Sequence, residues 1–430
     1  MDRGQFPRLV RDRRFQRLLA VRIASTTSDG LLQAALTSFV LFSPERQPTP
    51  AKILTAFGVL LLPYSVFGPF IGVLIDRWQR QRILVWATIV RALCVLGVAG
   101  LVAGGHAGSS LAVAVLVALG IGRFVAATVS ASLPHTVDDD LLVAANSVAP
   151  TAGTLMSITG GMIGVTISTA LGGSDTASVF IICTAAIGHL IATLLSTRIP
   201  RHELGPDERR QRTLFEVLGW LRSGIVHLNE RRPAARAILR VSLHRAAFGG
   251  ATLLVLMLTR NSFNDTAHST HALEQFSFVI GVAGVGAFVG AVLTPPMSDR
   301  FGVVPWARGV LVGSSIVLAS AFAFAAANPL SSLALPSVLV GSTCIGFAGQ
   351  CTKISSDTVV QTNVDDSHRG RVFALYDMAL NFGIVAGTAL GAATIPTTGQ
   401  SPRFAGILGL FLIAAAAVPN VPRRSAQEIA

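Results

Sequence analysis

Long apolar stretches alternate with short polar connections along almost the whole chain. A run of about 20 apolar residues can cross a bilayer as a helix, which satisfies its own backbone hydrogen bonds there. Twelve such stretches can be placed, so we expect an all-α membrane protein with twelve transmembrane helices. The expected spans are residues 15–42, 53–75, 83–104, 110–133, 142–171, 177–197, 236–259, 274–297, 304–326, 333–357, 370–395 and 403–419.

The longest polar connection, residues 198–236, separates six spans from six. Within it, the stretch LFEVLGWLRSGIVHL repeats apolar residues at helical spacing, which predicts an amphipathic helix on the inner membrane face. We therefore expect three parts in the chain. They are an N-terminal six-helix half over 1–200, a cytoplasmic linker over 201–235 and a C-terminal six-helix half over 236–430.

Composition supports a membrane protein and excludes several other classes. The 430 residues are 51% hydrophobic and 13% charged, whereas soluble domains carry roughly 25% charged residues. The four cysteines lie in apolar runs without metal-ligand spacing, so we expect no metal and no cofactor. The sequence has no phosphate-binding loop, no H-E-x-x-H and no G-x-S-x-G motif, which argues against an ATP-driven pump and against an enzyme.

The positive charge is distributed unevenly over the connections. With a cytoplasmic N-terminus, 24 of the 34 basic residues fall in or beside inside segments, four in outside loops and six in spans. The positive-inside rule therefore predicts a cell-membrane protein with both termini in the cytoplasm. This distribution explains the net charge of +12 through contact with the lipid bilayer, and we expect no nucleic-acid partner.

Short motifs recur between the two halves at a nearly constant offset of 223–227 residues. DRWQ at 76–79 recurs as DRFG at 299–302, and PHTVDDD at 134–140 resembles QTNVDDS at 361–367. Parallel six-helix repeats with a binding site near the midplane are a known transporter architecture. Small residues that let helices approach closely also recur, and we expect packing roles for them. These residues are Gly160, Gly161 and Gly164 in the first half and Gly387 and Gly391 in the second.

The connection GVLIDRWQRQRIL at 72–84 resembles the G-x-L-x-D-R-x-G-R-R-x-x-L loop of the major facilitator superfamily. The matching residues are Gly72, Leu74, Asp76, Arg77, Arg80 and Leu84, and the second copy keeps Asp299, Arg300 and Gly302. The resemblance implies that this loop latches the two halves in the outward-facing state. From the residues alone, the arginines of the loop would hold it at the anionic inner leaflet, or the segment is a plain turn. SDGLLQAAL and RGRVFALYDM further resemble the drug-efflux and siderophore-exporter branch.

Ionisable side chains inside spans are costly and mark candidate sites for proton coupling or substrate binding. The ionisable candidates are Asp29, Arg123, Lys353, Asp357 and Asp377, and polar Asn381 lies near the last of these. The resemblance implies that Arg123 in span 4 supports proton coupling, and we expect it to lie near Asp29 in span 1. Lys353 and Asp357 share one face of a helix and either neutralise each other or leave Lys353 to meet an anionic group. We expect the remaining arginines of the spans to extend to the interface. They are Arg22, Arg91, Arg240, Arg245 and Arg308.

The resemblance implies a secondary active transporter that moves its substrate by alternating access. We expect a monomer that exports an amphipathic small molecule, drug-like, lipid-like or siderophore-like, and that uses the proton gradient as its energy source. An importer or uniporter of the same fold is one alternative. A non-transporting scaffold or sensor is another, and the charges inside the spans argue against it.

Overall fold

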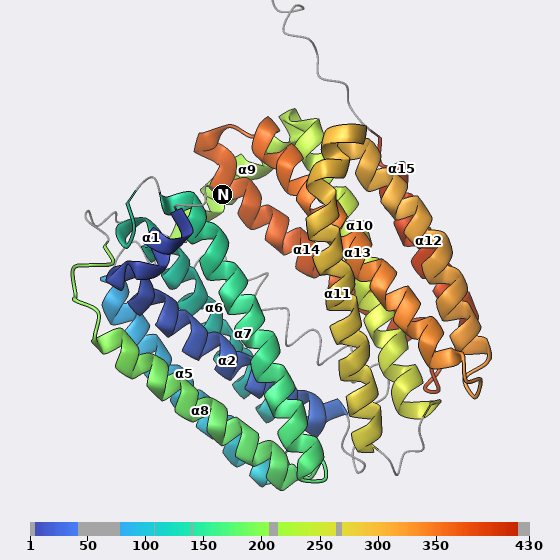
Figure 1. The fold of residues 1–430 in the computed structure, drawn as a ribbon, viewed down its shortest axis with the longest axis horizontal. Coiled ribbons are helices and arrows are strands. Elements are labelled where there is room, and N and C mark those ends of the chain that lie inside the picture. Colours follow the sequence, from blue (N-terminus) through green and yellow to red (C-terminus); the bar gives the residue numbers. More distant parts are fainter. Residues whose placement is uncertain are drawn as a thin grey trace, which may run out of the picture. The chain divides into compact units, whose positions relative to one another are not determined.

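The computed structural model describes residues 5–41, 78–106, 108–138, 141–205, 214–263 and 269–419, and the regular structure in these ranges is entirely helical (Figure 1). The expected all-α fold is confirmed. The helices are α1 (Gln5–Arg11), α2 (Arg13–Leu41), α5 (Arg80–Ala103), α6 (Ser109–Ser132), η1 (Leu133–His135), α7 (Leu142–Ala170), α8 (Asp175–Thr197), α9 (Leu214–Glu230), α10 (Arg232–Asn261), α11 (Ser269–Phe301), α12 (Val303–Ala327), α13 (Ala334–Asn363), α14 (Asp366–Thr394) and α15 (Pro402–Ala417).

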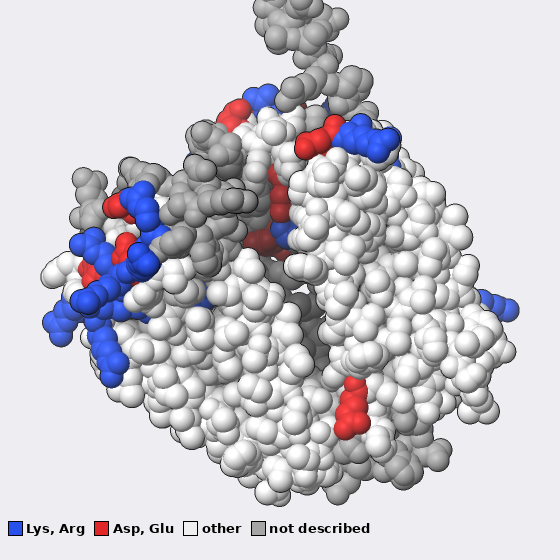
Figure 2. All heavy atoms as spheres, in the orientation of Figure 1, with Lys and Arg blue, Asp and Glu red and all other residues white. Residues whose placement is uncertain are grey.

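Eleven of the twelve expected spans coincide with a helix, and the expected span 53–75 lies outside the described residues. Within the described ranges, nine helices are long and apolar enough to cross a bilayer by length and composition alone. The space-filling view in Figure 2 agrees with this reading for the face it shows. There the flanks of the helices carry few charges, and basic side chains gather around α1.

The chain divides into two compact units. The first contains α1, α2 and α5–α8, and the second contains α10 and α12–α15. The boundaries between the units fall inside α9, after Val217, and inside α11, after Glu274. Most of the expected linker helix therefore belongs to the second unit.

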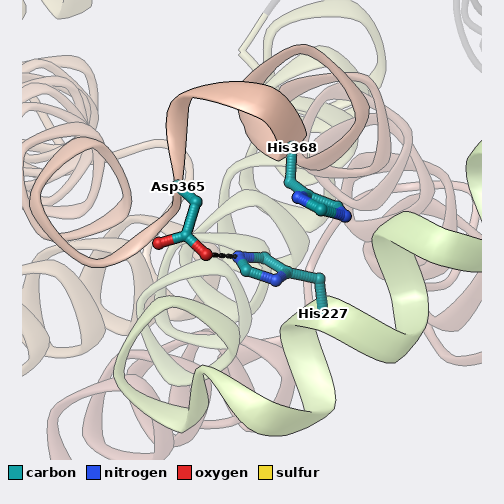
Figure 3. Close-up of side chains that lie close together, drawn as sticks. All are labelled: His227, Asp365 and His368. Atoms are coloured by element: carbon teal, nitrogen blue, oxygen red, sulfur yellow. Dashed lines mark ion pairs between the residues drawn. The ribbon is translucent and has the colours of Figure 1, made fainter.

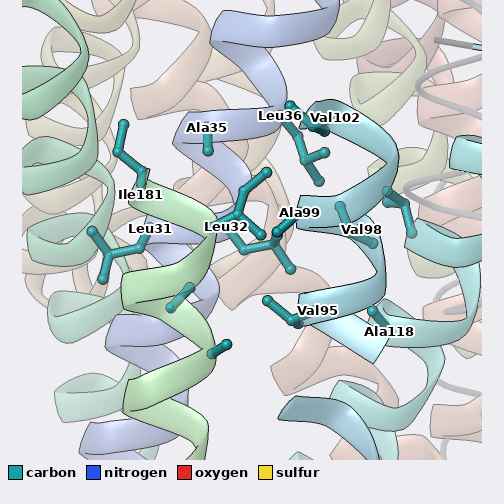
Figure 4. Close-up of a cluster of buried hydrophobic side chains, with 14 of the residues drawn as sticks. Leu31, Leu32, Ala35, Leu36, Val95, Val98, Ala99, Val102, Ala118 and Ile181 are labelled. Carbon is teal, nitrogen blue, oxygen red and sulfur yellow. The ribbon is translucent and has the colours of Figure 1, made fainter. Parts of the chain in front are cut away.

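In the first unit, α2 packs against α7 and α8, and α5 packs against α6 and α8. Figure 4 shows the apolar cluster where α2, α5, α6 and α8 meet. Leu32 of α2 is at its centre, between α8 and α5. The other buried members drawn there include Leu31, Ala35, Leu36, Val95, Val98, Ala99, Val102, Ala118 and Ile181.

Glycines let α2 and α7 of the first unit approach backbone to backbone. A Cβ atom added at Gly160 would overlap the carbonyl oxygen of Thr27, and one added at Gly30 would overlap that of Ser157. Gly164 continues the contact one turn further, where a Cβ would lie 2.7 Å from the Cβ of Ala34. Gly161 contributes less, because its Cβ would be 3.9 Å from the nearest backbone oxygen of α2. Close packing of small residues is how helices gain association energy in lipid.

The second unit repeats this contact between α10 and α14. A Cβ at Gly387 would overlap the carbonyl oxygen of Ala246, and one at Gly249 would overlap that of Ile384. A Cβ at Gly391 would meet Leu253, the position that corresponds to Ala34 in the first unit. The contacts therefore recur at 227 residues on one helix and 219 on the other, which places the same device in both units.

The second copy of the loop motif differs from the sequence expectation. Asp299 and Arg300 were expected in a connection, but α11 continues through them to Phe301. The break between α11 and α12 is the single residue Gly302, whose φ of +86° is readily adopted only by glycine. The helix also passes through Pro295 and Pro296 without ending.

The predicted linker helix is present as α9. It packs on the start of α14, where Gly224 fits against Arg371 and Leu375. Arg371 also donates from Nη1 to the hydroxyl of Ser223. The expected position of this helix on the inner membrane face stays a prediction.

Candidate functional site

An ion pair between α2 and α5 lies inside the first unit. Nη2 of Arg91 is 2.5 Å from Oδ1 of Asp29. Arg91 is only 1% exposed, and its other nitrogens donate to the carbonyl oxygen of Ala118 at 3.1 Å and to the hydroxyl of Ser25 at 3.4 Å. Gly122 on α6 provides the space, because a Cβ there would overlap the guanidinium group. Three helices therefore enclose one buried cation and connect it to a single carboxylate.

This arrangement corrects two expectations for the arginines. Arg91 was expected to extend to the interface, and that prediction is wrong, because a buried guanidinium needs a counter-charge and hydrogen-bond acceptors that the bilayer does not supply. Arg123 was expected to lie near Asp29. Among the described residues, however, Asp29 forms an ion pair with Arg91 and lies beside His189, while Arg123 is partly exposed on α6.

His189 brings a third helix, α8, to the same carboxylate. Its Nε2 is 3.8 Å from Oδ1 of Asp29, and the side chain is fully buried. Within the described part of the chain, neither ring nitrogen of His189 has a hydrogen-bond partner. The Asp29 side chain is itself 21% exposed, although its Oδ1 is buried. The cluster of Asp29, Arg91 and His189 thus combines an accessible acid, a buried base and a buried cation.

The charges of Asp29 and Arg91 depend on one another. While Asp29 is ionised, its charge balances that of Arg91. Protonation of Asp29 would leave Arg91 buried with its charge unbalanced, a state that costs several kcal/mol in a low-dielectric interior. The ionised carboxylate of Asp29 therefore stabilises the position of Arg91 between α2, α5 and α6.

A second group of charges occupies the second unit. On α13, Nζ of Lys353 is 2.6 Å from Oδ2 of Asp357, so the two residues form the pair that their spacing predicts. Tyr376 of α14 is buried, its ring centroid lies 5.9 Å from Nζ of Lys353, and its hydroxyl has no hydrogen-bond partner among the described residues. Arg245 of α10 lies over the ring of Phe248.

Sequence reasoning did not select Tyr376 as a site residue, although it is part of the RGRVFALYDM stretch that was singled out. A tyrosine in a span is ordinary core by sequence. Only the fold shows that Tyr376 is buried beside the pair of Lys353 and Asp357. The neighbouring candidates Asp377 and Asn381 lie one turn apart on α14, with Asp377 exposed and Asn381 partly buried.

The loop motif is described only in part. Gly72, Asp76 and Arg77 lie outside the described residues. Arg80 begins α5 and was expected to face the lipid leaflet, but it is buried. Its Nη1 donates to the carbonyl oxygens of Ala131 at 2.9 Å and Leu204 at 3.1 Å. Arg80 therefore ties the start of α5 to the segment after α8, because those carbonyls supply the acceptors that the charge needs.

Two further arginines in the second unit meet at one carbonyl. Arg240 of α10 and Arg308 of α12 both donate through Nη2 to the carbonyl oxygen of Val418, directly after α15. Arg240 is buried, so its expected extension to the interface is also wrong. In the first unit, Arg22 donates to the hydroxyl of Ser130 at 3.4 Å.

These features define a class of protein. Long apolar helices in two units, the same glycine contact in each and charged clusters inside the spans are the attributes of a two-repeat membrane transporter. The family follows from the sequence. A sequence model of the Major Facilitator Superfamily matches residues 18–388 and 247–429, and the chain belongs to this superfamily. Its fold and family are those of transporters rather than enzymes.

Three known proteins show how near the relationships are. The chain is 34% identical over 420 residues to an uncharacterized MFS-type transporter of Mycobacterium tuberculosis. The aligned region covers 96% of this chain and 92% of that protein. It is 34% identical over 80 residues to macrolide efflux protein A of Streptococcus pyogenes. This aligned region covers 18% of this chain and 19% of that one. The crystal structure of the nucleoside transporter NupG superposes with a TM-score of 0.71 at 15% identity, over 94% of this chain and 99% of that one.

Proposed function

We propose that the protein exports an amphipathic small molecule across the cell membrane in exchange for protons, by alternating access. The observation that carries the proposal is the cluster of Asp29, Arg91 and His189 inside the first unit. A protein that only supported a partner in the membrane would have no use for a half-buried carboxylate beside a buried guanidinium and a buried imidazole, because each is costly inside a span.

Coupling follows from the charge balance at Asp29. Ionised Asp29 holds Arg91 between α2, α5 and α6, and protonated Asp29 releases it. A conformational equilibrium responds to a ligand only through a difference in binding free energy between the states. The ion pair supplies that difference for the proton. A conformation in which Asp29 pairs with Arg91 disfavours protonation of Asp29, and a conformation without the pair favours it.

The direction and the substrate class rest on two supports. One is the resemblance of SDGLLQAAL and RGRVFALYDM to exporters. The other is the short match to a macrolide efflux protein, which covers less than a fifth of the chain. With two tyrosines and four tryptophans in 430 residues, a large aromatic-lined cage is not evident, and a lipid-like or mixed hydrophobic substrate fits as well as a planar drug. We propose a monomer with both termini in the cytoplasm.

The first test identifies a substrate. The chain is expressed in a bacterial host that lacks its main efflux transporters, and accumulation of a macrolide, of ethidium and of a radiolabelled siderophore is measured with and without a protonophore. We expect lower accumulation of at least one compound, and the protonophore should abolish the difference. Higher accumulation on expression would instead identify an importer.

The second test isolates the coupling residue in proteoliposomes, using the compound found in the first. Asp29→Asn should abolish accumulation driven by an imposed pH gradient while it leaves downhill exchange intact, because exchange needs the conformational change but no titration. Asp175→Asn is the matched control, since Asp175 is the first residue of α8 in the same unit and should leave accumulation unchanged. Full gradient-driven accumulation by the Asp29 variant would refute the role of this cluster, and Asp357 and Asp377 would be tested next.

A further inference from the structure

A cluster of metal-ligand side chains joins α9 to the start of α14 (Figure 3). His227 is on the last turn of α9, Asp365 directly precedes α14, and His368 is on its first turn. Nε2 of His227 is 3.7 Å from Oδ2 of Asp365, and the two imidazole rings stack with centroids 4.3 Å apart. One ligand atom from each of the three side chains lies within 4.8 Å of the other two. Residues 138 and 141 positions apart thus meet at one place, which no local sequence spacing indicates.

Burial and open access are combined in this cluster. His227 is 6% exposed, and its Nε2 has no hydrogen-bond partner among the described residues. Asp365 is 54% exposed, so the carboxylate faces solution. Arg231 donates from Nη2 to both oxygens of Asp365 at 3.1 Å. This contact fixes the orientation of the carboxylate, as residues around metal ligands do.

We propose that His227, Asp365 and His368 bind a divalent transition-metal ion of the zinc class. Two imidazole nitrogens and one carboxylate oxygen are ligands that zinc accepts, and the exposed side of Asp365 leaves a fourth position for water. The site lies in the second unit and is separate from the Asp29 cluster of the first, so its occupancy and proton coupling are separate questions.

Binding requires one defined movement. Ligands bound to zinc at about 2.0–2.1 Å lie roughly 3.3 Å from one another, so the three atoms, now within 4.8 Å, must close by up to about 1.5 Å. In the stack, the ring planes are 11° apart and their nitrogen lone pairs therefore lie in nearly parallel planes. The His368 ring, at the half-buried start of α14, turns out of the stack to meet the ion, while buried His227 keeps its place.

The bound ion would strengthen a contact that already exists. Arg371 and Ser223 join the same two helices by a hydrogen bond one to two turns away. An ion held by side chains from both helices adds a link that depends on metal concentration, and it fastens the linker helix to the first turn of α14. Metal concentration would thereby control how firmly the linker helix α9 is attached to α14 of the C-terminal half.

The test uses the full chain in detergent, purified on a tag without histidines, stripped with a chelator and treated with N-ethylmaleimide to block its four cysteines. Co²⁺ is titrated by its visible absorption and then displaced with Zn²⁺. We expect one site per chain, and at least about a tenfold loss of affinity in His227→Gln and in His368→Gln. The matched control is His271→Gln, because His271 also pairs with an acid, Glu274, at 3.4 Å but belongs to no group of three metal-ligand side chains among the described residues. Its affinity should equal that of the parent.

A second measurement guards against variants that fold poorly. Zn²⁺ should raise the temperature at which the parent and His271→Gln lose their helical circular dichroism, and it should leave that of His227→Gln unchanged. Absence of a Co²⁺ spectrum in the parent would overturn the proposal, and the cluster would then be a packing contact between the stacked rings. Equal affinities for the His227 and His271 variants would overturn it as well.

Discussion

Gly160→Ala should destabilise the first unit, although alanine is the better helix former. The new Cβ would overlap the carbonyl oxygen of Thr27 and lie 2.9 Å from its carbonyl carbon, whereas ordinary contact begins at about 3.4 Å. The obstacle is helix backbone, which cannot turn aside as a side chain can. The two helices α2 and α7 must therefore separate by something on the order of 1 Å along their contact, and that change reaches tightly packed neighbours.

The expected size follows from two opposed effects. Overpacking a tight interface costs about 1–3 kcal/mol, and we expect the upper end because the clash is with backbone. Replacing glycine by alanine inside a helix returns up to about 1 kcal/mol. The net loss is then about 2 kcal/mol for Gly160→Ala. Gly161→Ala is the matched control at the next position, where a Cβ has 3.9 Å of space and only the favourable effect remains.

The assay is the fraction of monodisperse protein on size-exclusion chromatography after heating in detergent, with helical circular dichroism as a second probe. The midpoint should fall for Gly160→Ala and stay level or rise for Gly161→Ala. Gly387→Ala should behave like Gly160→Ala, because its Cβ would overlap the carbonyl oxygen of Ala246 in the second unit. A Gly160 variant as stable as the Gly161 variant would refute the close-approach argument.

Three further outcomes are expected. Arg91→Gln should lower the heating midpoint, since breaking a buried pair costs about 3–5 kcal/mol. Adding Asp29→Asn should recover part of the loss, and a double variant less stable than the single one would contradict the pairing. Arg80→Ala should speed trypsin cleavage after α8, because it removes the hydrogen bond to the segment there, while exposed Arg82→Ala should leave the rate unchanged. A cysteine at exposed Gln400, in a chain without its native cysteines, should react with an impermeant maleimide from outside intact cells, and labelling only after permeabilisation would reverse the expected topology.

The spans were predictable because each depends on a local property, a run of apolar residues long enough to cross the bilayer. The α7 side of the glycine contact, Gly160 and Gly164, was likewise visible as small residues at repeated positions, whereas Gly30 of α2 was not selected. Expectations failed where the answer depended on a partner distant in sequence. Nothing near Arg91 in the chain indicates that Asp29, 62 residues earlier, and the space beside Gly122 will receive its guanidinium group.

The connection between α11 and α12 failed for a different reason. Charged residues were taken to mark a loop. Asp299 and Arg300 are instead part of the last turn of α11, because charged residues occur at helix ends as well as in loops. One glycine with positive φ was enough to turn the chain. The metal-ligand cluster could not be predicted from the sequence either, because His227 and Asp365 belong to elements that only the fold brings together.

The hydrogen bonds to Val418 have a consequence for how the protein is made. The chain leaves the ribosome from its N-terminus, so α10 and α12 are synthesised before α15 is complete. Until then, the acceptor that Arg240 and Arg308 share is missing from the growing chain. Both of these hydrogen bonds can form only after α15 and Val418 have been synthesised. We expect a nascent chain that stops short of Val418 to present two guanidinium groups without this acceptor to the quality-control proteases of the membrane.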